Sequence, residues 1–276
     1  MSRLQLAQVT LCAVDTRAPA LAAQSLLRSM QQVDFCRVLL FTRGWLPTVV
    51  LPGIEIIDID TIRSGTEYSR FVMRTLPAYV RSSHALITQW DGFVVHAEAW
   101  SDEFLVHDYI GAVWPDQAET CSVGNGGFSL RSRRFMAAGM DPRIVEEHPE
   151  DMVLCRQQRD FLERVHGVSF APPKLARRFA YENESPSGKT FGFHGPYNLP
   201  DVLDEATLLE WLERLPSEFF ASRDARRLAR ALLLRGMPEA AHALLKRREA
   251  AGRSEPSTKL LRAAASIMGL FTSRPK

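Results

Sequence analysis

The sequence predicts an α/β fold in which helices flank a mixed, mostly parallel sheet, followed by an all-α C-terminal appendage. Through the first half of the chain, short apolar runs typical of strands alternate with amphipathic runs typical of helices. After residue 200 the runs are Ala- and Leu-rich, with helical spacing and Gly or Pro turns between them. We therefore expect one domain over residues 1–200 and a helical appendage over 201–276.

The composition is that of an ordinary soluble protein. Its 276 residues are 46% hydrophobic and 24% charged. The longest apolar runs fall short of the roughly 18 residues that a membrane-spanning helix needs. The four cysteines show neither C-x-x-C nor zinc spacing. Reduced thiols indicate a cytoplasmic protein, with contact at the inner face of the membrane as a further option.

Charge is distributed unevenly along the chain. Residues 221–276 hold 13 Lys or Arg against 4 Asp or Glu, a balance of +9, which leaves 21 against 28, or −7, for residues 1–220. An acidic main domain disfavours a nucleic-acid partner. The basic segment has two interpretations: a solvated face of small helices, or a surface that contacts an anionic membrane or an acidic protein.

The elements of the first half follow from local patterns. Apolar, β-branched runs predict strands, and Ala/Leu spacing predicts helices between them. The predicted strands cover 9–14, 37–42, 54–59 and 84–88, and the predicted helices cover about 19–31 and 67–80. In a parallel sheet, ligands bind beyond the carboxyl ends of the strands. Asp91, in the turn QWDG, follows the fourth strand at such an end.

The second half is richer in turns. Short strand-like segments DYIGAVWP and VGNGGFSLRS precede a helix over about 150–166 and the segment FGFHGPYNL. After the linker-like NLPD, helices are predicted at about 204–214, on both sides of RGMPE, and at about 256–270. Helix, Gly turn and helix is typical of helical-hairpin repeats, although one or two units do not establish a repeat.

Two loops offer candidate ligand contacts. The carboxylate of Asp91 is suited to a divalent cation that neutralises a diphosphate, although an Asp-Gly pair also occurs in simple turns. The glycines around Asn125, in GNGG, allow a backbone to approach a ligand closely. A bulged hairpin without function would show the same pattern.

Two further segments offer acid–base groups. Glu150 and Asp151 open a predicted helix, where acidic residues commonly complement the helix dipole. Either one could instead face a pocket and act as general base toward a hydroxyl. His194 lies between glycines and aromatic residues, which leaves its imidazole free to contact a metal or a phosphate oxygen.

Taken together, the segments ALITQWDGFVVHAEAW, DYIGAVW, VGNGGFSLRSRRF, PEDMVLCR and FGFHG resemble the bacterial DUF5672 family, a glycosyltransferase-like family of GT-A (Rossmann-like) architecture. The similarity covers roughly residues 5–198 in the family's motif order. It implies a nucleotide-sugar site on the amino-terminal strands and an acceptor site on the later segments. The C-terminal helices lie outside it.

The resemblance implies a role for each candidate. Asp91 corresponds to the second acid of an Asp-x-Asp element, and Gln89 replaces the first, which leaves a need for Mn²⁺ or Mg²⁺ open. Asp151 corresponds to the base, Glu150 to a group that orients a substrate hydroxyl, and His194 to a contact with metal or diphosphate. Donor contacts are expected at Thr10, Ala13, Asp15, Glu67, Ser69, Arg70, Gln89 and Asp91, and sugar or acceptor contacts at Trp90, Gly124, Asn125, Gly126 and Gly127.

The activity implied is transfer of a hexose from a UDP-sugar to a hydroxyl of a cell-surface glycan precursor or lipid-linked acceptor, with inversion. One alternative is an inactive scaffold that recruits a partner through the basic tail. Another is a nucleotidyltransferase, but such an enzyme would normally hold a triphosphate with a Gly-rich, basic loop after the first strand. CAVDTRAPAL has one Arg and no glycine there.

Overall fold

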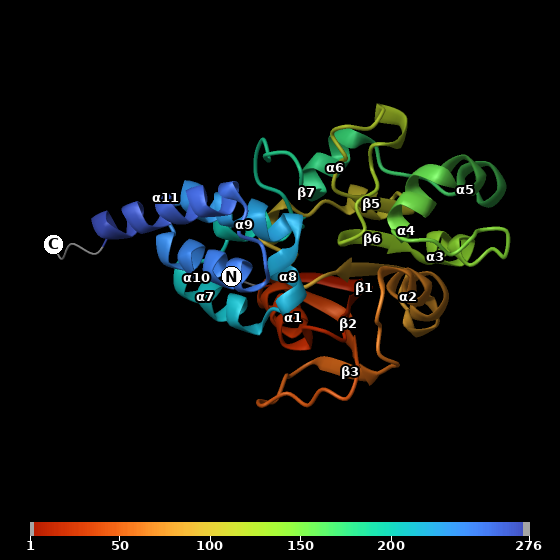
Figure 1. Cartoon of the computed structure of the whole chain (residues 1–276). Helices are drawn as coiled ribbons and strands as arrows, with labels where there is room; N and C mark the ends of the chain where they lie inside the picture. Colours follow the sequence, from red (N-terminus) through yellow and green to blue (C-terminus); the bar gives the residue numbers. More distant parts are fainter. Residues whose placement is uncertain (1–2, 273–276) are drawn as a thin grey trace. The chain divides into compact units, whose positions relative to one another are not determined.

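The computed structural model describes residues 3–272 of the chain. The chain divides into two compact units, Met1–His194 and Gly195–Lys276 (Figure 1). This division falls a few residues before the boundary predicted at residue 200. Residues 273–276, the end of the predicted basic segment, lie outside the described part.

A six-stranded sheet forms the centre of the first unit, in the order β3-β2-β1-β4-β6-β5. The four strands from β3 to β4 are parallel, and β6 runs antiparallel to both of its neighbours. The strands are β1 (Leu4–Val14), β2 (Val33–Thr42), β3 (Ile54–Asp58), β4 (His84–Thr88), β5 (Tyr109–Gly111) and β6 (Phe128–Ser132). The predicted mixed, mostly parallel sheet is confirmed.

Helices cover both faces of this sheet because successive side chains of a buried strand point to opposite sides. On one face Leu11 of β1 shares a core with Leu26 of α1 (Pro19–Gln32). On the other face Cys12 shares a core with Leu76. All four cysteines are free thiols.

Two helices predicted as continuous are interrupted. The first breaks at Leu76, where Pro77 lacks the N–H that an α-helix would use. It becomes α2 (Gly65–Arg70), a π-helical turn (Phe71–Thr75) and a 3₁₀ turn (Leu76–Tyr79). The second becomes α4 (Glu150–Met152), a π-helical turn (Val153–Gln157) and α5 (Arg159–His166).

A second, two-stranded parallel sheet completes the first unit, and the sequence patterns do not predict it. It pairs β7 (Ala180–Tyr181) with β8 (Gly192–Phe193). Two further short helices, α3 (Arg133–Gly139) and α6 (Pro173–Phe179), are also additions to the prediction. Because β7 and β8 are parallel, the residues that follow them, Glu182 and His194, leave the sheet at the same end.

The second unit consists of helices throughout its described part. They are α7 (Glu205–Arg214), α8 (Ser217–Ala221), α9 (Arg223–Leu234), α10 (Pro238–Ala250) and α11 (Pro256–Thr272). Side-chain caps at Asp204 and Ser222 begin α7 and α9, as in the usual pattern for helix starts. No helix in residues 3–272 has the length and apolar character needed to cross a membrane.

Candidate active site

His194 lies between two carboxylates. Its Nδ1 is 3.0 Å from Oε1 of Glu182, and its Nε2 is 3.4 Å from Oδ1 of Asp91. Burial opposes a charge on the ring, but the charges of Asp91 and Glu182 outweigh it and raise the pKa of His194 well above its ordinary value. Glu182 Oε1 and Gln89 Oε1 are acceptors that match a ring donating from both nitrogens, and Asn125 Nδ2 also lies 3.3 Å from Nδ1. These contacts favour the charged form of the ring.

Asn125 joins this pair to the glycine loop. Its Nδ2 donates to Glu182 Oε2 at 2.9 Å, and its Oδ1 accepts from the backbone N–H of Gly127 at 3.2 Å. Only the amide orientation with Nδ2 toward the carboxylate satisfies both contacts. Asn125 is 5% exposed, so it contributes to a closed and ordered network.

Gln89 is held in one orientation from two sides. Its Nε2 donates to the hydroxyl of Tyr68 at 3.1 Å, and its Oε1 lies 3.2 Å from Nε2 of His194. Gln89 thus places a neutral amide oxygen against the imidazole of His194.

Asp91 keeps one carboxylate oxygen available. Its Oδ1 is buried and has no hydrogen-bond partner among the described residues. A divalent ion with oxygen ligands takes about six of them. Residues 3–272 contain no group of three or more His, Cys, Asp and Glu side chains placed to hold a metal. No step below depends on a metal.

The acidic pair separates into two roles. Glu150 forms a buried ion pair with Arg131, with Oε1 3.0 Å from Nη2. Asp151 accepts from the backbone N–H of Gly126 at 2.8 Å. Burial and the nearby charge of Glu150 raise the pKa of Asp151 to about 6, although the Gly126 hydrogen bond and Arg131 act against them. Asp151 is thus the group that can exchange a proton near neutral pH.

The glycines of the loop are required by contacts with the chain's own side chains. A Cβ on Gly127 would lie 2.0 Å from Nε2 of His194, and one on Gly126 would lie 2.8 Å from Oε1 of Glu150. A Cβ on Gly124 would meet the ring of Trp114 at 2.3 Å. The loop therefore passes between the His194 cluster and the Glu150–Asp151 pair and touches both.

The predicted donor residues on the first strand lie in different environments. Thr10 and Ala13 are fully buried, and the hydroxyl of Thr10 is 2.7 Å from that of Ser82. Asp15, at the end of β1, accepts from the backbone N–H groups of Arg17 and Ala18. Burial is the largest cause that raises the pKa of Asp15, and the charge of Asp91 adds to it. Of these three residues, Asp15 is the one whose pKa is affected by the charge of Asp91.

The predicted donor residues of α2 point in two directions. The hydroxyl of Ser69 is 3.0 Å from Nδ1 of His148, close to the acidic pair in sequence. Glu67 accepts from the backbone N–H of Arg63, and Arg70 forms an ion pair with Glu146 at 2.6 Å. Glu67 and Arg70 line a cavity of about 580 Å³ at the ends of β2 and β3. The backbone carbonyl of Trp90, another predicted contact, accepts from Ser25 at 2.6 Å.

Three residues of the site were missed by the sequence analysis: Glu182, Tyr68 and Arg131. Glu182 lies in the polar segment YENESP, which is typical of a loop, and only the β7–β8 pairing brings it to His194. Arg131 alternates with apolar residues in β6, which is typical of an exposed position, yet it is 2% exposed. No local sequence pattern distinguishes Arg131 from an exposed strand residue.

A family model described as "Protein of unknown function (DUF5672)" matches residues 53–194, which is 142 of the 276 residues. The chain belongs to the DUF5672 family. The match ends at His194, so it contains both parallel strands β7 and β8, the contacts of His194 and the Glu150–Asp151 pair, but not the donor residues predicted on β1. No protein of curated function matches the sequence.

Two solved structures similar to this DUF5672 protein are both 12% identical to it. The apo-form glycosyltransferase GlyE of Streptococcus pneumoniae TIGR4 has a TM-score of 0.41, with 68% of this chain and 54% of that chain covered. Glucosyl-3-phosphoglycerate synthase of Mycobacterium tuberculosis, in complex with Mn²⁺, UDP and phosphoglyceric acid, has a TM-score of 0.39, with 59% and 67% covered. The chain spans about half the length of GlyE. Similarity at this level carries no argument about function, which depends on the residues of the site.

Proposed function

We propose that this protein is an inverting glycosyltransferase of GT-A type. It moves a sugar, a hexose, from a UDP-sugar to a hydroxyl of a cell-surface glycan precursor or lipid-linked acceptor. The observation that carries the proposal is the placement of the segment 125–127, which contacts His194 on one side and Asp151 on the other.

The cation stabilises the leaving group in this proposal. When the bond between the sugar's anomeric carbon and the diphosphate oxygen breaks, negative charge grows on that oxygen. A buried imidazolium whose position is fixed by Glu182 and Gln89 can accept that charge without reorganising. The uncharged Gln89, in place of a carboxylate, reduces repulsion of the diphosphate.

Asp151 removes the proton of the acceptor. The acceptor hydroxyl oxygen forms the new bond to the anomeric carbon, the diphosphate leaves with the bonding electrons, and the hydroxyl proton passes to a carboxylate oxygen of Asp151. Each of its oxygens accepts one backbone N–H, from Gly126 and Met152, so lone pairs remain for the proton. A base with a pKa of about 6 suits neutral conditions.

Glu150 and Arg131 act as a support for this geometry. The guanidinium of Arg131 also donates to the carbonyl of Gly126 at 3.3 Å, so the buried pair holds the same peptide segment that positions Asp151. The direct displacement that this arrangement favours inverts the anomeric carbon.

A panel of nucleotide-sugars tests the proposal through thermal stability, followed by product analysis with the donor that binds. A ligand at about 100 times its Kd stabilises the folded protein by about 2.7 kcal/mol. We expect one UDP-sugar to stabilise the wild type and not Asp91→Ala, whereas Asp116→Ala, an exposed loop control, behaves as wild type.

A wild type that no nucleotide-sugar stabilises would contradict the transferase proposal and would favour the inactive scaffold. A product that retains the anomeric configuration would remove the inversion alone.

A further inference from the structure

The solvent side of α11 carries large apolar side chains beside polar ones. Leu260 is 73% exposed and Ile267 is 57% exposed, and the exposed Ala263 lies between them. Residues spaced by three, four and seven positions share one face of a helix. We call Leu260, Ala263 and Ile267 the α11 stripe.

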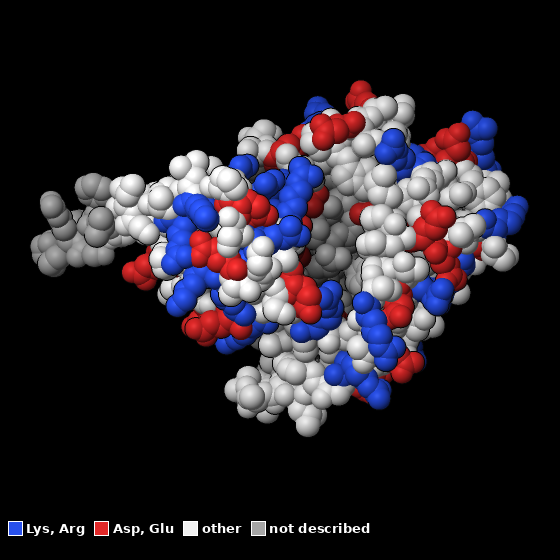
Figure 2. All heavy atoms as spheres, viewed as in Figure 1, with Lys and Arg blue, Asp and Glu red and all other residues white. Residues whose placement is uncertain are grey.

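Cations flank the α11 stripe. Lys259 precedes Leu260 on the helix and is exposed, and Lys246 of α10 is exposed on the side that faces α11. Neither ammonium has an acidic partner within residues 3–272. Arg262, in contrast, forms an ion pair with Glu249. Figure 2 shows Lys and Arg atoms, in blue, interspersed with Asp and Glu atoms, in red, over the helices of this unit.

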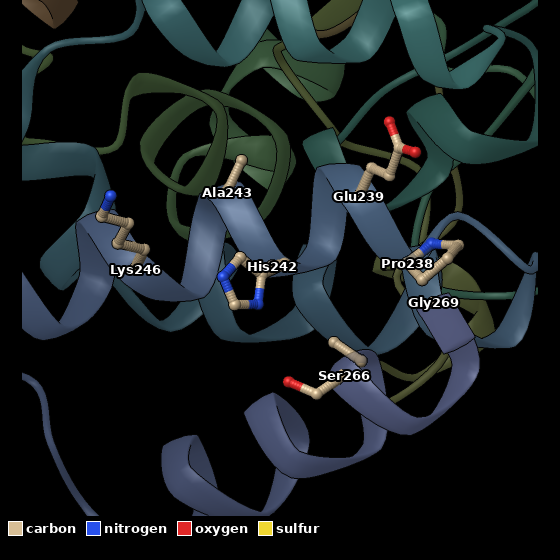
Figure 3. Close-up of a pocket in the computed structure, with 8 residues that line it drawn as sticks. Pro238, Glu239, His242, Ala243, Lys246, Ser266 and Gly269 are labelled. Carbon is tan, nitrogen blue, oxygen red and sulfur yellow. The ribbon is translucent and has the colours of Figure 1, made fainter. Parts of the chain in front are cut away.

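A groove of about 500 Å³ separates α10 from α11, and its lining combines small apolar residues with the charged Glu239 and Lys246. Figure 3 shows His242 and Lys246 of α10 on one side of it and Ser266 of α11 on the other. By helical periodicity, Lys259 lies between Ser266 and Ala263 around the axis of α11. The groove, the cation and the apolar stripe therefore form one continuous surface.

We propose that this surface of α11 docks the protein on an anionic lipid bilayer, with the α11 stripe in the headgroup region and Lys246 and Lys259 against lipid phosphates. The charge of the region, +9 over residues 221–276, complements such a membrane. An exposed apolar helix face beside lysines is the arrangement by which helices lie in a membrane interface.

A lipid surface fits better than a protein partner. A stable protein interface buries about 1,000 Å² or more in total. The α11 stripe offers two large apolar side chains on a convex helix, which is a small area for a shaped partner. A fluid bilayer accepts convex apolar side chains without needing a complementary surface.

The test is co-sedimentation of the full chain with vesicles. One set contains phosphatidylcholine alone, and the other contains equal parts of phosphatidylcholine and phosphatidylglycerol. We expect binding to the anionic vesicles only, and loss of binding at about 1 M salt, where the screening length falls to about 3 Å. The measurement requires no catalysis, so its outcome is separate from that of the transferase proposal.

Variants locate the contact. Each lysine near an anionic surface contributes about fivefold to partitioning, so Lys246→Gln with Lys259→Gln should weaken binding about 25-fold. Leu260→Ser with Ile267→Ser should also weaken it. The matched controls are Lys174→Gln and Leu46→Ser, which are exposed in the first unit and should bind as wild type. Circular dichroism verifies that every variant is folded.

Three results would overturn the inference. The first is no sedimentation with anionic vesicles, and the second is equal binding to both vesicle types. The third is binding that is weakened neither by the two lysine substitutions nor by the substitutions of Leu260 and Ile267. Binding to polyglutamate without binding to vesicles would assign the surface to an acidic protein instead.

Discussion

Glu182 Oε1 lies 3.0 Å from Nδ1 of His194, at the ring nitrogen opposite the one that faces Asp91. Glu182 enters the site only because β7 and β8 pair in parallel. The pKa of the His194 imidazole should therefore depend on Glu182.

Glu182→Gln should lower the pKa of His194, because it removes one of the two anions that raise this pKa while leaving a hydrogen-bonding oxygen. A folded-state pKa above the ordinary 6.5 stabilises the protein fully below pH 6.5, and this stabilisation is lost as pH rises through the folded pKa. Compared with the wild type, the variant should therefore lose the most stability at the lowest pH values at which Glu182 is still ionised. A histidine NMR titration measures the pKa, with Glu98→Gln, beside the half-buried His96, as the control. An unchanged His194 titration would contradict the assignment.

Transfer should rise with pH through about 6 and then level off, because Asp151 must be ionised to accept a proton. Asp151→Asn should lower kcat by about 10²–10⁴-fold with little change in donor affinity. Glu150→Gln should move the midpoint of the pH–rate profile downward, since the charge of Glu150 raises the pKa of Asp151. A profile with the same midpoint in Glu150→Gln would show that another group is the base.

Gly127→Ala should destabilise the protein by about 1–3 kcal/mol or displace His194, because the new methyl would overlap the imidazole. Gly188→Ala is the matched control, since a Cβ there meets no atom within 4 Å. Thermal unfolding compares the two variants. Equal stability of both would mean that the loop and His194 are further apart than described.

Arg131→Met should cost about 3–5 kcal/mol, because it leaves the Glu150 carboxylate buried without its partner. The double variant Arg131→Met with Glu150→Met should recover part of that loss, since it removes both buried charges. Denaturant unfolding of the full chain measures the difference. A double variant no more stable than the single one would indicate that Arg131 acts mainly through Ser129 and Gly126, which it also contacts.

Removal of divalent cations with EDTA should change UDP binding by less than about twofold, or about 0.4 kcal/mol. The reason is that His194 already supplies a positive charge and the described side chains form no metal cluster. Calorimetric titration with UDP, with and without Mn²⁺, measures the effect. A large gain with Mn²⁺ that Asp91→Ala abolishes would show that Asp91 Oδ1 binds an ion together with the nucleotide.

The strands were predictable because apolar, β-branched runs have few other structures available to them. The positions of Gln89, Asp91, Asn125 and His194 at loop ends followed from the same patterns. Contacts that depend on pairing between distant segments were not predictable. Glu182 reaches His194 through a two-residue strand that is too short to leave a period in the sequence.

Local sequence patterns also gave wrong expectations for the burial of Arg131 and for the continuity of the helix over 67–80. Arg131 has the alternating context of a solvent-facing strand position, and only the buried Glu150 explains why a cation lies there. The resemblance places Thr10 near the nucleotide; its buried hydroxyl lies 2.7 Å from that of Ser82. The helix expected over 67–80 ignored Pro77, whose missing N–H ends regular α-helix bonding.

The short β7–β8 ladder sets the geometry of Glu182 and His194, so this geometry does not depend on the length of the loop that connects the two strands. Residues 185–189 are exposed, and Gly188 has open space around it. Insertions there should leave the spacing of Glu182 and His194 intact, because the ladder sets that spacing. A cysteine introduced at Gly188 would carry a fluorophore a few residues from both side chains, which makes this loop a practical position for an optical reporter of ligand entry.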